Sequence, residues 1–163
     1  MSGCWLADAA ATDQLGQALA VAMPSQAVVH LRGELGAGKS TLARALLRAL
    51  GVKGAIRSPT YTLVECYPLA SGGEAWHLDL YRIADASELE FLGLDSSEAV
   101  LWLVEWPERG RHWLPSEDLV ISLEVEGSGR RVDLAPASPA GEAWLSQLDL
   151  TGAVAAHGLA GNS

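Results

Sequence analysis

Apolar residues recur along the chain at two spacings, and each spacing predicts a different element. Short continuous apolar runs at residues 27–31 and 99–104 are typical of strands buried on both faces. The segment 40–50 instead places its leucines on one broad face, which predicts an amphipathic helix. An earlier helix is expected to begin with Thr12 as its N-cap and to end before Pro24.

Shorter patterns predict the remaining elements. Glycine-rich turns at residues 71–73 and 127–129 each separate two segments of β type, which predicts two hairpins. The elements expected from these patterns are strands at residues 61–67, 75–81, 119–125 and 131–134, a short acidic helix capped by Ser87, and a last helix that starts at Ser138 and Pro139.

The sequence GELGAGKS, residues 33–40, lies directly between the first apolar strand and the leucine-rich helix. It fits the phosphate-binding P-loop pattern G-x-x-x-x-G-K-[ST]. Its glycines can expose successive backbone N–H groups to a phosphate, and the positive end of the helix dipole points to the same place. Lys39 adds a full positive charge, and the Ser40 hydroxyl can bind Mg²⁺. We therefore predict a nucleoside triphosphate site formed by Glu34, Leu35, Gly36, Ala37, Gly38, Lys39, Ser40 and Thr41.

With this motif, the order of elements predicts an α/β fold, a P-loop NTPase-like three-layer domain. Its central sheet is expected to be mixed but mainly parallel, because a hairpin lies between the P-loop helix and the strand at 99–104. A C-terminal β-hairpin follows. Residues 1–150 are expected to form this single domain, and residues 151–163 a flexible tail.

A P-loop also needs a carboxylate that binds Mg²⁺ directly or through water. Glu105 is the best candidate, because it would emerge at the carboxyl end of the apolar strand, where ligands bind in open α/β sheets. Aspartate is the usual residue at this place, and the alternative for Glu105 is an ordinary strand-end carboxylate without a role in metal binding. Asp79 shares a strand face with His77 and Tyr81. It would orient the attacking water, hold a metal-bound water, or lie on a solvated face without a role.

Three further residues each allow a functional and a purely structural interpretation. Thr60, in the loop Ser58–Thr60, would contact the γ-phosphate or would only stiffen the loop. Arg130 follows a glycine turn and would reach the nucleotide or lie in solvent. Trp106, which follows Glu105, would contact the ligand or pack in the core.

Composition narrows the classes of partner and ligand. The 163 residues carry 11 Lys and Arg against 20 Asp and Glu, a formal net charge of −9. Such a chain is a poor candidate for holding RNA unaided, because phosphate contacts need clustered cations. Cys4 and Cys66 are expected to be reduced thiols, and no apolar run has transmembrane length, so we expect a cytoplasmic protein without membrane contact. A GTPase would carry Asn-Lys-x-Asp, but the only asparagine is Asn162, so ATP is the expected nucleotide.

Five segments in order, GELGAGKST, SPTYTLVECY, HLDLYR, ELEFLGL and LVEWPER, closely resemble the TsaE family. The resemblance covers roughly residues 12–135, and five ordered motifs are far more specific than the P-loop alone. It implies an ATP-binding and slowly ATP-hydrolysing protein of tRNA threonylcarbamoyladenosine biosynthesis. Such a protein acts with TsaB and TsaD, and TsaD transfers the threonylcarbamoyl group to adenosine 37 of tRNAs that read codons beginning with A. We expect tRNA to be contacted only through this complex.

The resemblance also assigns roles to individual residues. It places the P-loop at residues 33–41 and the essential aspartate of the family at Asp79. Ser40 stands where many members have Thr, and both hydroxyls can bind Mg²⁺. The residues assigned by the resemblance are Ser40 and Glu105 for Mg²⁺, Thr60 in the SPT loop, Trp106 in the EWP segment, and Thr12 and Arg130 near the adenosine.

Two other functions remain compatible with the residues. A small-molecule kinase would use the same P-loop, with Arg109 and Arg111 after Pro107 as the arginines of a lid. A nucleotide-gated binding module would use ATP for assembly, with incidental hydrolysis. Activation of the partners by an Asp79→Ala variant would favour the binding module, and transfer of phosphate to a metabolite would favour the kinase.

Overall fold

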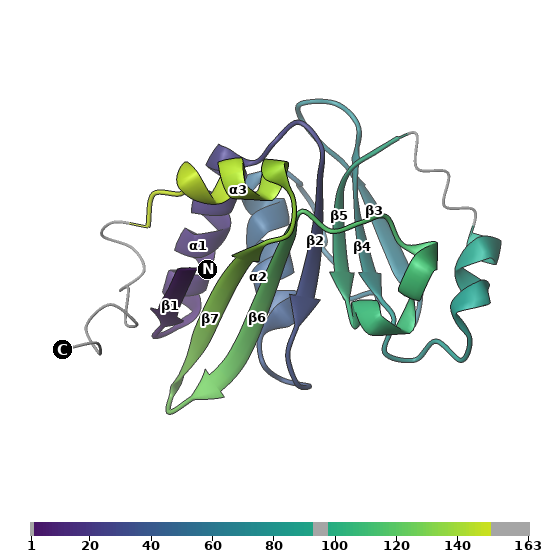
Figure 1. Cartoon of the computed structure of the whole chain (residues 1–163), viewed down its shortest axis with the longest axis horizontal. Helices are drawn as coiled ribbons and strands as arrows, with labels where there is room; N and C mark the ends of the chain where they lie inside the picture. Colours follow the sequence, from purple (N-terminus) through teal and green to yellow (C-terminus); the bar gives the residue numbers. More distant parts are fainter. Residues whose placement is uncertain (1, 93–97, 151–163) are drawn as a thin grey trace.

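The computed structural model describes residues 2–92 and 98–150, and within them seven strands form one sheet (Figure 1). The order across the sheet is β1-β7-β6-β2-β5-β4-β3. The strands are β1 (Ser2–Leu6), β2 (Ala27–Arg32), β3 (Val64–Pro68), β4 (Glu74–Asp79), β5 (Ala99–Glu105), β6 (Leu119–Glu126) and β7 (Gly129–Pro136). The helices are α1 (Ala9–Ala22), α2 (Lys39–Ala49) and α3 (Pro139–Ser146), with 3₁₀ helices η1 (Ala86–Leu92), η2 (Pro107–Arg109) and η3 (Arg111–Trp113).

The four middle strands of the sheet run parallel, and the strands toward both edges run antiparallel. β2 pairs in parallel with β5 and β6, and β5 pairs in parallel with β4. The pairs β3–β4, β6–β7 and β1–β7 are antiparallel. The predicted α/β fold with a mixed sheet and both predicted hairpins are therefore confirmed. The carboxyl ends of the parallel strands meet at one edge, which is the position of ligand sites in sheets of this kind.

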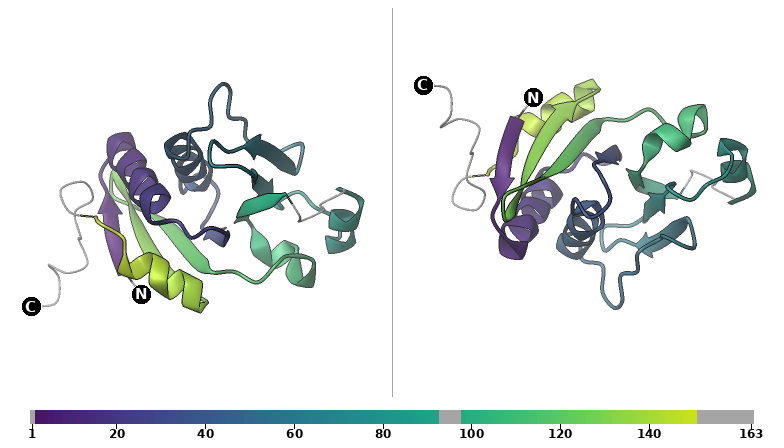
Figure 2. Two further views of the ribbon diagram at one scale, coloured as in Figure 1. Left: turned by 90° about the horizontal axis from the view of Figure 1, so that it is seen from above. Right: turned by 90° about the horizontal axis from the view of Figure 1, so that it is seen from below.

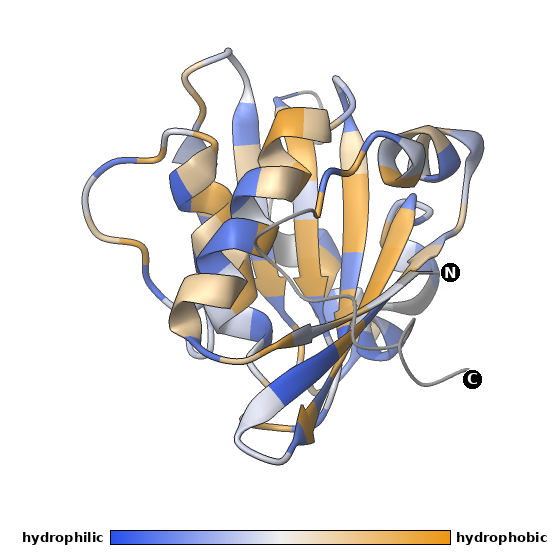
Figure 3. Ribbon diagram, turned by 90° about the vertical axis from the view of Figure 1, so that its left-hand side faces the viewer, coloured by the Kyte–Doolittle hydropathy of each residue, from blue (hydrophilic) through white to orange (hydrophobic). Residues whose placement is uncertain are grey.

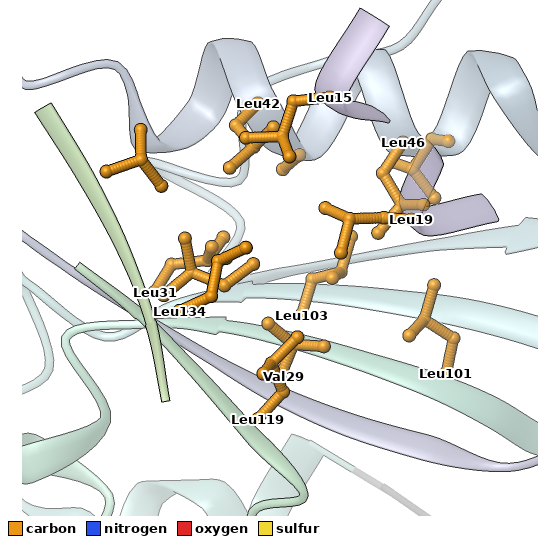
Figure 4. Close-up of a cluster of buried hydrophobic side chains, with 14 of the residues drawn as sticks. Leu15, Leu19, Val29, Leu31, Leu42, Leu46, Leu101, Leu103, Leu119 and Leu134 are labelled. Atoms are coloured by element: carbon orange, nitrogen blue, oxygen red, sulfur yellow. The ribbon is translucent and has the colours of Figure 1, made fainter. Parts of the chain in front are cut away.

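Helices α1 and α2 cover one face of the sheet (Figure 2). Figure 4 shows leucines of the two helices, among them Leu15 and Leu46, facing Val29, Leu101 and Leu103 of the strands. These side chains are almost completely buried. The central strands are the most continuously hydrophobic part of the fold (Figure 3), as strands buried on both faces require.

The opposite face of β4 and β5 is covered by short 3₁₀ helices rather than by α-helices. Along β5, Leu101 and Leu103 pack toward α1 and α2, while Trp102 and Val104 pack in a second core with Trp76 of β4. Residues of η1 and of the segment that follows β4 complete this second core. The third layer that the sequence predicted is therefore made of 3₁₀ turns at this side of the sheet.

Helix α3 lies at the end of the sheet opposite the carboxyl ends of β2 and β6 (Figure 1). Ser138 caps it, as predicted, and its hydroxyl donates to Asp118 Oδ1 at 2.6 Å. The other oxygen of Asp118 accepts the N–H of Val28 at 2.8 Å. Trp144 is 1% exposed and donates its indole N–H to the carbonyl of Leu19 in α1 at 3.1 Å. These contacts attach α3 to the start of β2 and to α1.

The start of α1 was predicted wrongly. Asp8, not Thr12, is the N-cap, and its side chain accepts the N–H of Ala11 at 2.9 Å. The three alanines that follow Asp8 have high helix propensity, so the helix extends upstream of the predicted start. Thr12 lies inside the first turns of α1 and is 8% exposed.

Three further boundaries differ from the prediction. β3 begins at Val64 because residues 59–63 form a turn, in which Leu63 has φ of 67° and donates its N–H to the carbonyl of Pro59 at 2.9 Å. β4 ends at Asp79 rather than at Tyr81. The segment predicted as a helix capped by Ser87 is the 3₁₀ helix η1.

Strand β1 was not predicted at all. It is only five residues long, and it pairs with β7, so that Cys4 lies opposite Val132 and Leu6 opposite Arg130. The predicted flexible tail, residues 151–163, lies outside the described residues. Across the described part of the chain, every helix is too short or too polar to cross a bilayer.

Candidate nucleotide-binding site

The glycine-rich loop, residues 33–38, connects the carboxyl end of β2 to α2. Gly33, Gly36 and Gly38 have φ of 148°, 80° and 104°, values that other residues rarely adopt. A Cβ on Gly33 would lie 2.5 Å from the backbone oxygen of Leu123, whereas one on Gly36 would meet open space. Gly38 is the N-cap of α2 and has no side chain with which to bond the first N–H groups of the helix. The loop is therefore a backbone cradle of the kind that binds anions.

Lys39, the first residue of α2, points back to the glycine-rich loop. It is 5% exposed, and its ammonium group donates to the carbonyl of Gly33 and lies 3.8 Å from the centroid of the Trp106 ring. Burial lowers the pKa of Lys39, and nearby carboxylates oppose that shift. These carboxylates belong to Glu105, Asp79, Glu108 and Glu34. The cation is thus held between a carbonyl, an aromatic ring and an acidic surround.

Glu105, at the end of β5, joins two elements at the site. Its carboxylate accepts the hydroxyl of Ser40, with distances of 2.9 and 3.2 Å to the two oxygens. His77 Nε2 lies 2.6 Å from Glu105 Oε2 and donates to it, because a carboxylate only accepts. Glu105 is 3% and His77 1% exposed, so both are removed from solvent. His77 was not predicted as a site residue, and the only signal was its place on the same strand face as Asp79.

Asp79 lies beside Glu105, since the two residues are in register between β4 and β5. It is 8% exposed, its backbone N–H donates to the carbonyl of Leu63, and its Oδ1 accepts the N–H of Tyr81 at 3.0 Å. The row His77–Asp79–Tyr81 expected from strand spacing is broken, because β4 ends at Asp79. Two carboxylates and a hydroxyl, all oxygen donors, therefore meet at the start of α2.

Trp106 connects Lys39 to the segment after β4. It has φ of 56° and ψ of 52°, a conformation that is uncommon for a large side chain and typical of functional sites. The centroid of its ring lies 4.9 Å from that of the Tyr81 ring. The guanidinium of Arg109 lies 5.3 Å from the centroid of the same Tyr81 ring. Arg109 of η2 thus packs against Tyr81 rather than extending as part of a long lid.

A separate cavity of about 250 Å³ lies on the other side of the glycine-rich loop. It brings together Thr12, Thr41 and Arg130, three of the residues that the sequence predicted. The glycine-rich loop contributes Gly38, a fourth predicted residue, and the other lining residues come from the β1–α1 connection and the β6–β7 hairpin, among them Asp8 and Ser128. This volume suits a compact group the size of a nucleoside moiety. A larger hollow of about 1030 Å³ lies at the opposite end of α2, between its last residues and those of α1.

The remaining predicted residues lie at the rim. Glu34 and Leu35 are exposed at the tip of the glycine-rich loop. The hydroxyl of Thr60 forms a hydrogen bond with that of Ser58 at 2.7 Å, and its loop is bonded to Asp79 through the carbonyl of Leu63.

The oxygen atoms of Ser40 and Glu105 at the start of α2 are suitable ligands for Mg²⁺. Within the described residues, no group of three or more His, Cys, Asp and Glu could hold a metal by itself. The Ser40 hydroxyl and the Glu105 carboxylate are nevertheless hard oxygen donors in contact with each other, beside a cradle for anions. Mg²⁺ commonly takes one or two such protein ligands and completes its shell with water and phosphate oxygens.

Comparison with known proteins gives a consistent match. The model of the family described as "Threonylcarbamoyl adenosine biosynthesis protein TsaE" matches residues 6–132. The chain is 40% identical over 121 residues to the tRNA threonylcarbamoyladenosine biosynthesis protein TsaE of Haemophilus influenzae, covering 73% of this chain and 76% of that protein. It is 36% identical over 139 residues to the protein of the same name from Streptomyces coelicolor, covering 82% and 93%. The crystal structure of Bacillus subtilis YdiB has the same fold, with a TM-score of 0.73 at 23% identity over 89% of this chain and 91% of that one.

Proposed function

The chain belongs to the TsaE family, and from this premise we propose that it is an ATP-binding and slowly ATP-hydrolysing subunit of tRNA threonylcarbamoyladenosine formation. It is required, with TsaB and TsaD, to form the threonylcarbamoyl group on adenosine 37 of tRNAs that read codons beginning with A. One observation carries the proposal. The glycine-rich loop, the buried Lys39 and the Ser40–Glu105 pair meet at the carboxyl ends of β2 and β5.

ATP occupies both sides of this loop in the proposal. The phosphates lie on the backbone of residues 34–38 and the start of α2, where N–H groups and the helix dipole favour negative charge. The adenosine occupies the 250 Å³ cavity, whose lining includes Thr12 and Thr41.

Mg²⁺ would be held by Ser40 and Glu105. When bound, the ion neutralises charge on the phosphates during their transfer to water. Four carboxylates act on Lys39, so a triphosphate without a divalent cation would be repelled by these groups. We therefore expect ATP binding to depend steeply on Mg²⁺. Metal-free and Mg²⁺-containing titrations of the same protein measure this dependence.

Asp79 is the proposed catalytic residue. Its position in register with Glu105 supports a role in orienting the attacking water or in holding a metal-bound water. Either role acts in the reacting state, so Asp79→Ala should lower hydrolysis while leaving ATP binding largely intact. Trp106 and the Thr60 loop are the proposed contacts beside the γ-phosphate, because Trp106 touches Lys39 and the Thr60 loop is tied to Asp79 through Leu63.

The remaining features concern partners and location. A net charge of −9 favours contact with proteins over direct contact with tRNA, so tRNA is reached through the complex with TsaB and TsaD. The proposed location is the cytoplasm, because both cysteines are free thiols and tRNA is modified in that reducing compartment.

The chain offers a matched pair of variants to test nucleotide binding, because Lys39 and Lys53 are its only lysines. Lys39→Ala should weaken Mg²⁺–ATP binding by a hundredfold or more in calorimetry, since a charge-assisted phosphate contact is lost, on the order of 1.5–3 kcal/mol for each bond. Lys53→Ala removes the same charge from an exposed position and should bind as the wild type does. Near-normal affinity of Lys39→Ala would refute the proposed site. Release of inorganic phosphate, rather than a phosphorylated metabolite, separates the ATPase from a kinase.

A further inference from the structure

The guanidinium of Arg130 is bonded to backbone carbonyls on two segments of the chain. Its Nε donates to the carbonyl of Ala37 at 3.1 Å, and its Nη2 to that of Gly36 at 3.4 Å. Its Nη1 donates to the carbonyl of Gly129 at 2.9 Å. The side chain thus joins the first residue pair of β7 to the glycine-rich loop, although 93 residues separate Arg130 from Ala37 in sequence.

The three antiparallel strands at this edge hold Arg130 in place. β7 lies between β1 and β6, and Arg130 is in register with Leu6 on one side and Val125 on the other. Gly129 allows this approach, since a Cβ there would lie 2.4 Å from the carbonyl oxygen of Leu6. β6 also touches the loop directly, because its Leu123 carbonyl packs against the position where Gly33 lacks a Cβ.

The contacts of Arg130 determine which way the peptide units of the loop face. In a planar trans peptide, the carbonyl of one residue and the N–H of the next point in opposite directions. Binding the carbonyl of Ala37 therefore turns the N–H of Gly38 away from Arg130. Ala37 donates its own N–H to Glu34 at 3.1 Å, which closes the turn. Arg130 thus stabilises the loop conformation in which N–H groups are free to meet a phosphate.

We propose that Arg130 is a positioning residue, which holds the glycine-rich loop in its phosphate-binding conformation through the carbonyls of Gly36 and Ala37. This inference rests on the proposed nucleotide site and changes the role expected for Arg130 from the family resemblance, which was contact with adenosine. The determinant of phosphate affinity then extends from the loop itself to the β1–β7–β6 edge of the sheet.

The test compares two ligands, Mg²⁺–ATP and Mg²⁺–inorganic triphosphate, because the second has no base or ribose. Arg130→Ala should weaken binding of both by about the same factor, tenfold or more, since charged donors to two carbonyls are lost. Arg131→Ala is the matched control, because Arg131 is exposed and lies 3.6 Å from Asp133 on the same strand. Loss of affinity for ATP alone would overturn the inference and restore a contact with adenosine. If the wild type binds neither ligand, the proposed function fails instead.

A second measurement separates positioning from direct contact with phosphate. In the nucleotide-free protein, Arg130→Ala should speed amide hydrogen exchange at Ala37, whose N–H is bonded to the carbonyl of Glu34, and leave the rates in α1 unchanged. An Arg130 that only touches bound phosphate would leave the exchange of the free protein unaltered, and this result would overturn the inference. Arg130→Lys keeps the charge but not the planar fork, so it should show the same losses as Arg130→Ala. Full recovery by lysine in both measurements would contradict the proposal.

Discussion

The contact between His77 and Glu105 makes the sharpest prediction. His77→Leu fills a similar volume in the core but removes the donor 2.6 Å from the Glu105 carboxylate. Glu105, 3% exposed, is then left with the Ser40 hydroxyl as its only side-chain hydrogen-bond donor among the described residues. His77→Gln is the matched control, because a glutamine amide can present an N–H close to the position of the histidine Nε2.

The expected losses follow from the burial of this pair. A hydrogen bond to a charged group contributes about 1.5–3 kcal/mol, so the free energy of unfolding should fall by about that amount in His77→Leu. For a domain of this size each kcal/mol lowers Tm by about 2–4 °C, which gives a decrease of about 3–12 °C. If Glu105 holds Mg²⁺, the loss of the residue that orients it should also weaken Mg²⁺-dependent ATP binding about 10–100-fold.

Thermal unfolding and calorimetric ATP titrations at several Mg²⁺ concentrations measure the two effects separately. His77→Gln should recover most of the stability and most of the Mg²⁺ dependence. Equal loss of Mg²⁺ affinity in both variants would show that the hydrogen bond does not orient Glu105. Wild-type stability in His77→Leu would show that the buried contact contributes nothing to the fold.

Three further predictions concern other parts of the molecule. Burial and the charge of Asp133 raise the pKa of the Cys4 thiol to about 11, whereas Cys66 is exposed. Alkylation of the native protein at pH 8, followed by mass spectrometry, should therefore modify Cys66 alone. Equal labelling of Cys4 would mean that β1 is not paired with β7. Burial lowers the pKa of His30 in the folded state, so the unfolded chain takes up the proton first, and stability to urea should fall as pH drops below about 6.5. His30→Gln should make the stability to urea less dependent on pH, and an unchanged pH dependence would mean that another group causes it. Trp144→Ala should lower the unfolding free energy by about 3–5 kcal/mol in urea titrations, because a fully buried ring and its bond to α1 are lost, and a loss below 1 kcal/mol would contradict the docking of α3.

The parts of the fold that could be predicted from the sequence are those with strong local signals. The buried strands β2 and β5 are continuous apolar runs, and the glycines of the loop between β2 and α2 have few other uses. Glu105 could be predicted as a site residue because a charge directly after a buried strand must lie at its end. These signals need no knowledge of which distant segments meet.

The parts that could not be predicted depend on pairing between distant segments. β1 has five residues with little pattern of their own, and β7, more than 120 residues later, determines its conformation. His77 becomes a site residue only through its partner Glu105, 28 residues away. Arg130 was predicted near the nucleotide, but its bonds to the glycine-rich loop, 93 residues away at Ala37, were not. A histidine in a strand and an arginine after a turn carry no signal of these contacts.

Local propensity also misled where a turn replaced a strand. Tyr61 to Leu63 has the composition of a strand, but the turn begun at Pro59 places Leu63 at positive φ, and pairing starts one residue later. At the start of α1, Thr12 and Asp8 are both competent caps, and the alanines between them favour the longer helix. The start of β3 and the N-cap of α1 each depend on small free-energy differences between alternative local structures, and packing with distant segments determines which one forms.

The central claim is most directly tested by ATP hydrolysis with Mg²⁺, measured for the chain alone and after addition of TsaB and TsaD from the same source. The account predicts slow turnover alone, a higher rate with the partners, and a loss of both in Asp79→Ala with ATP binding retained. Hydrolysis that does not change when the partners are added, or an Asp79→Ala variant that hydrolyses ATP at the wild-type rate, would contradict it.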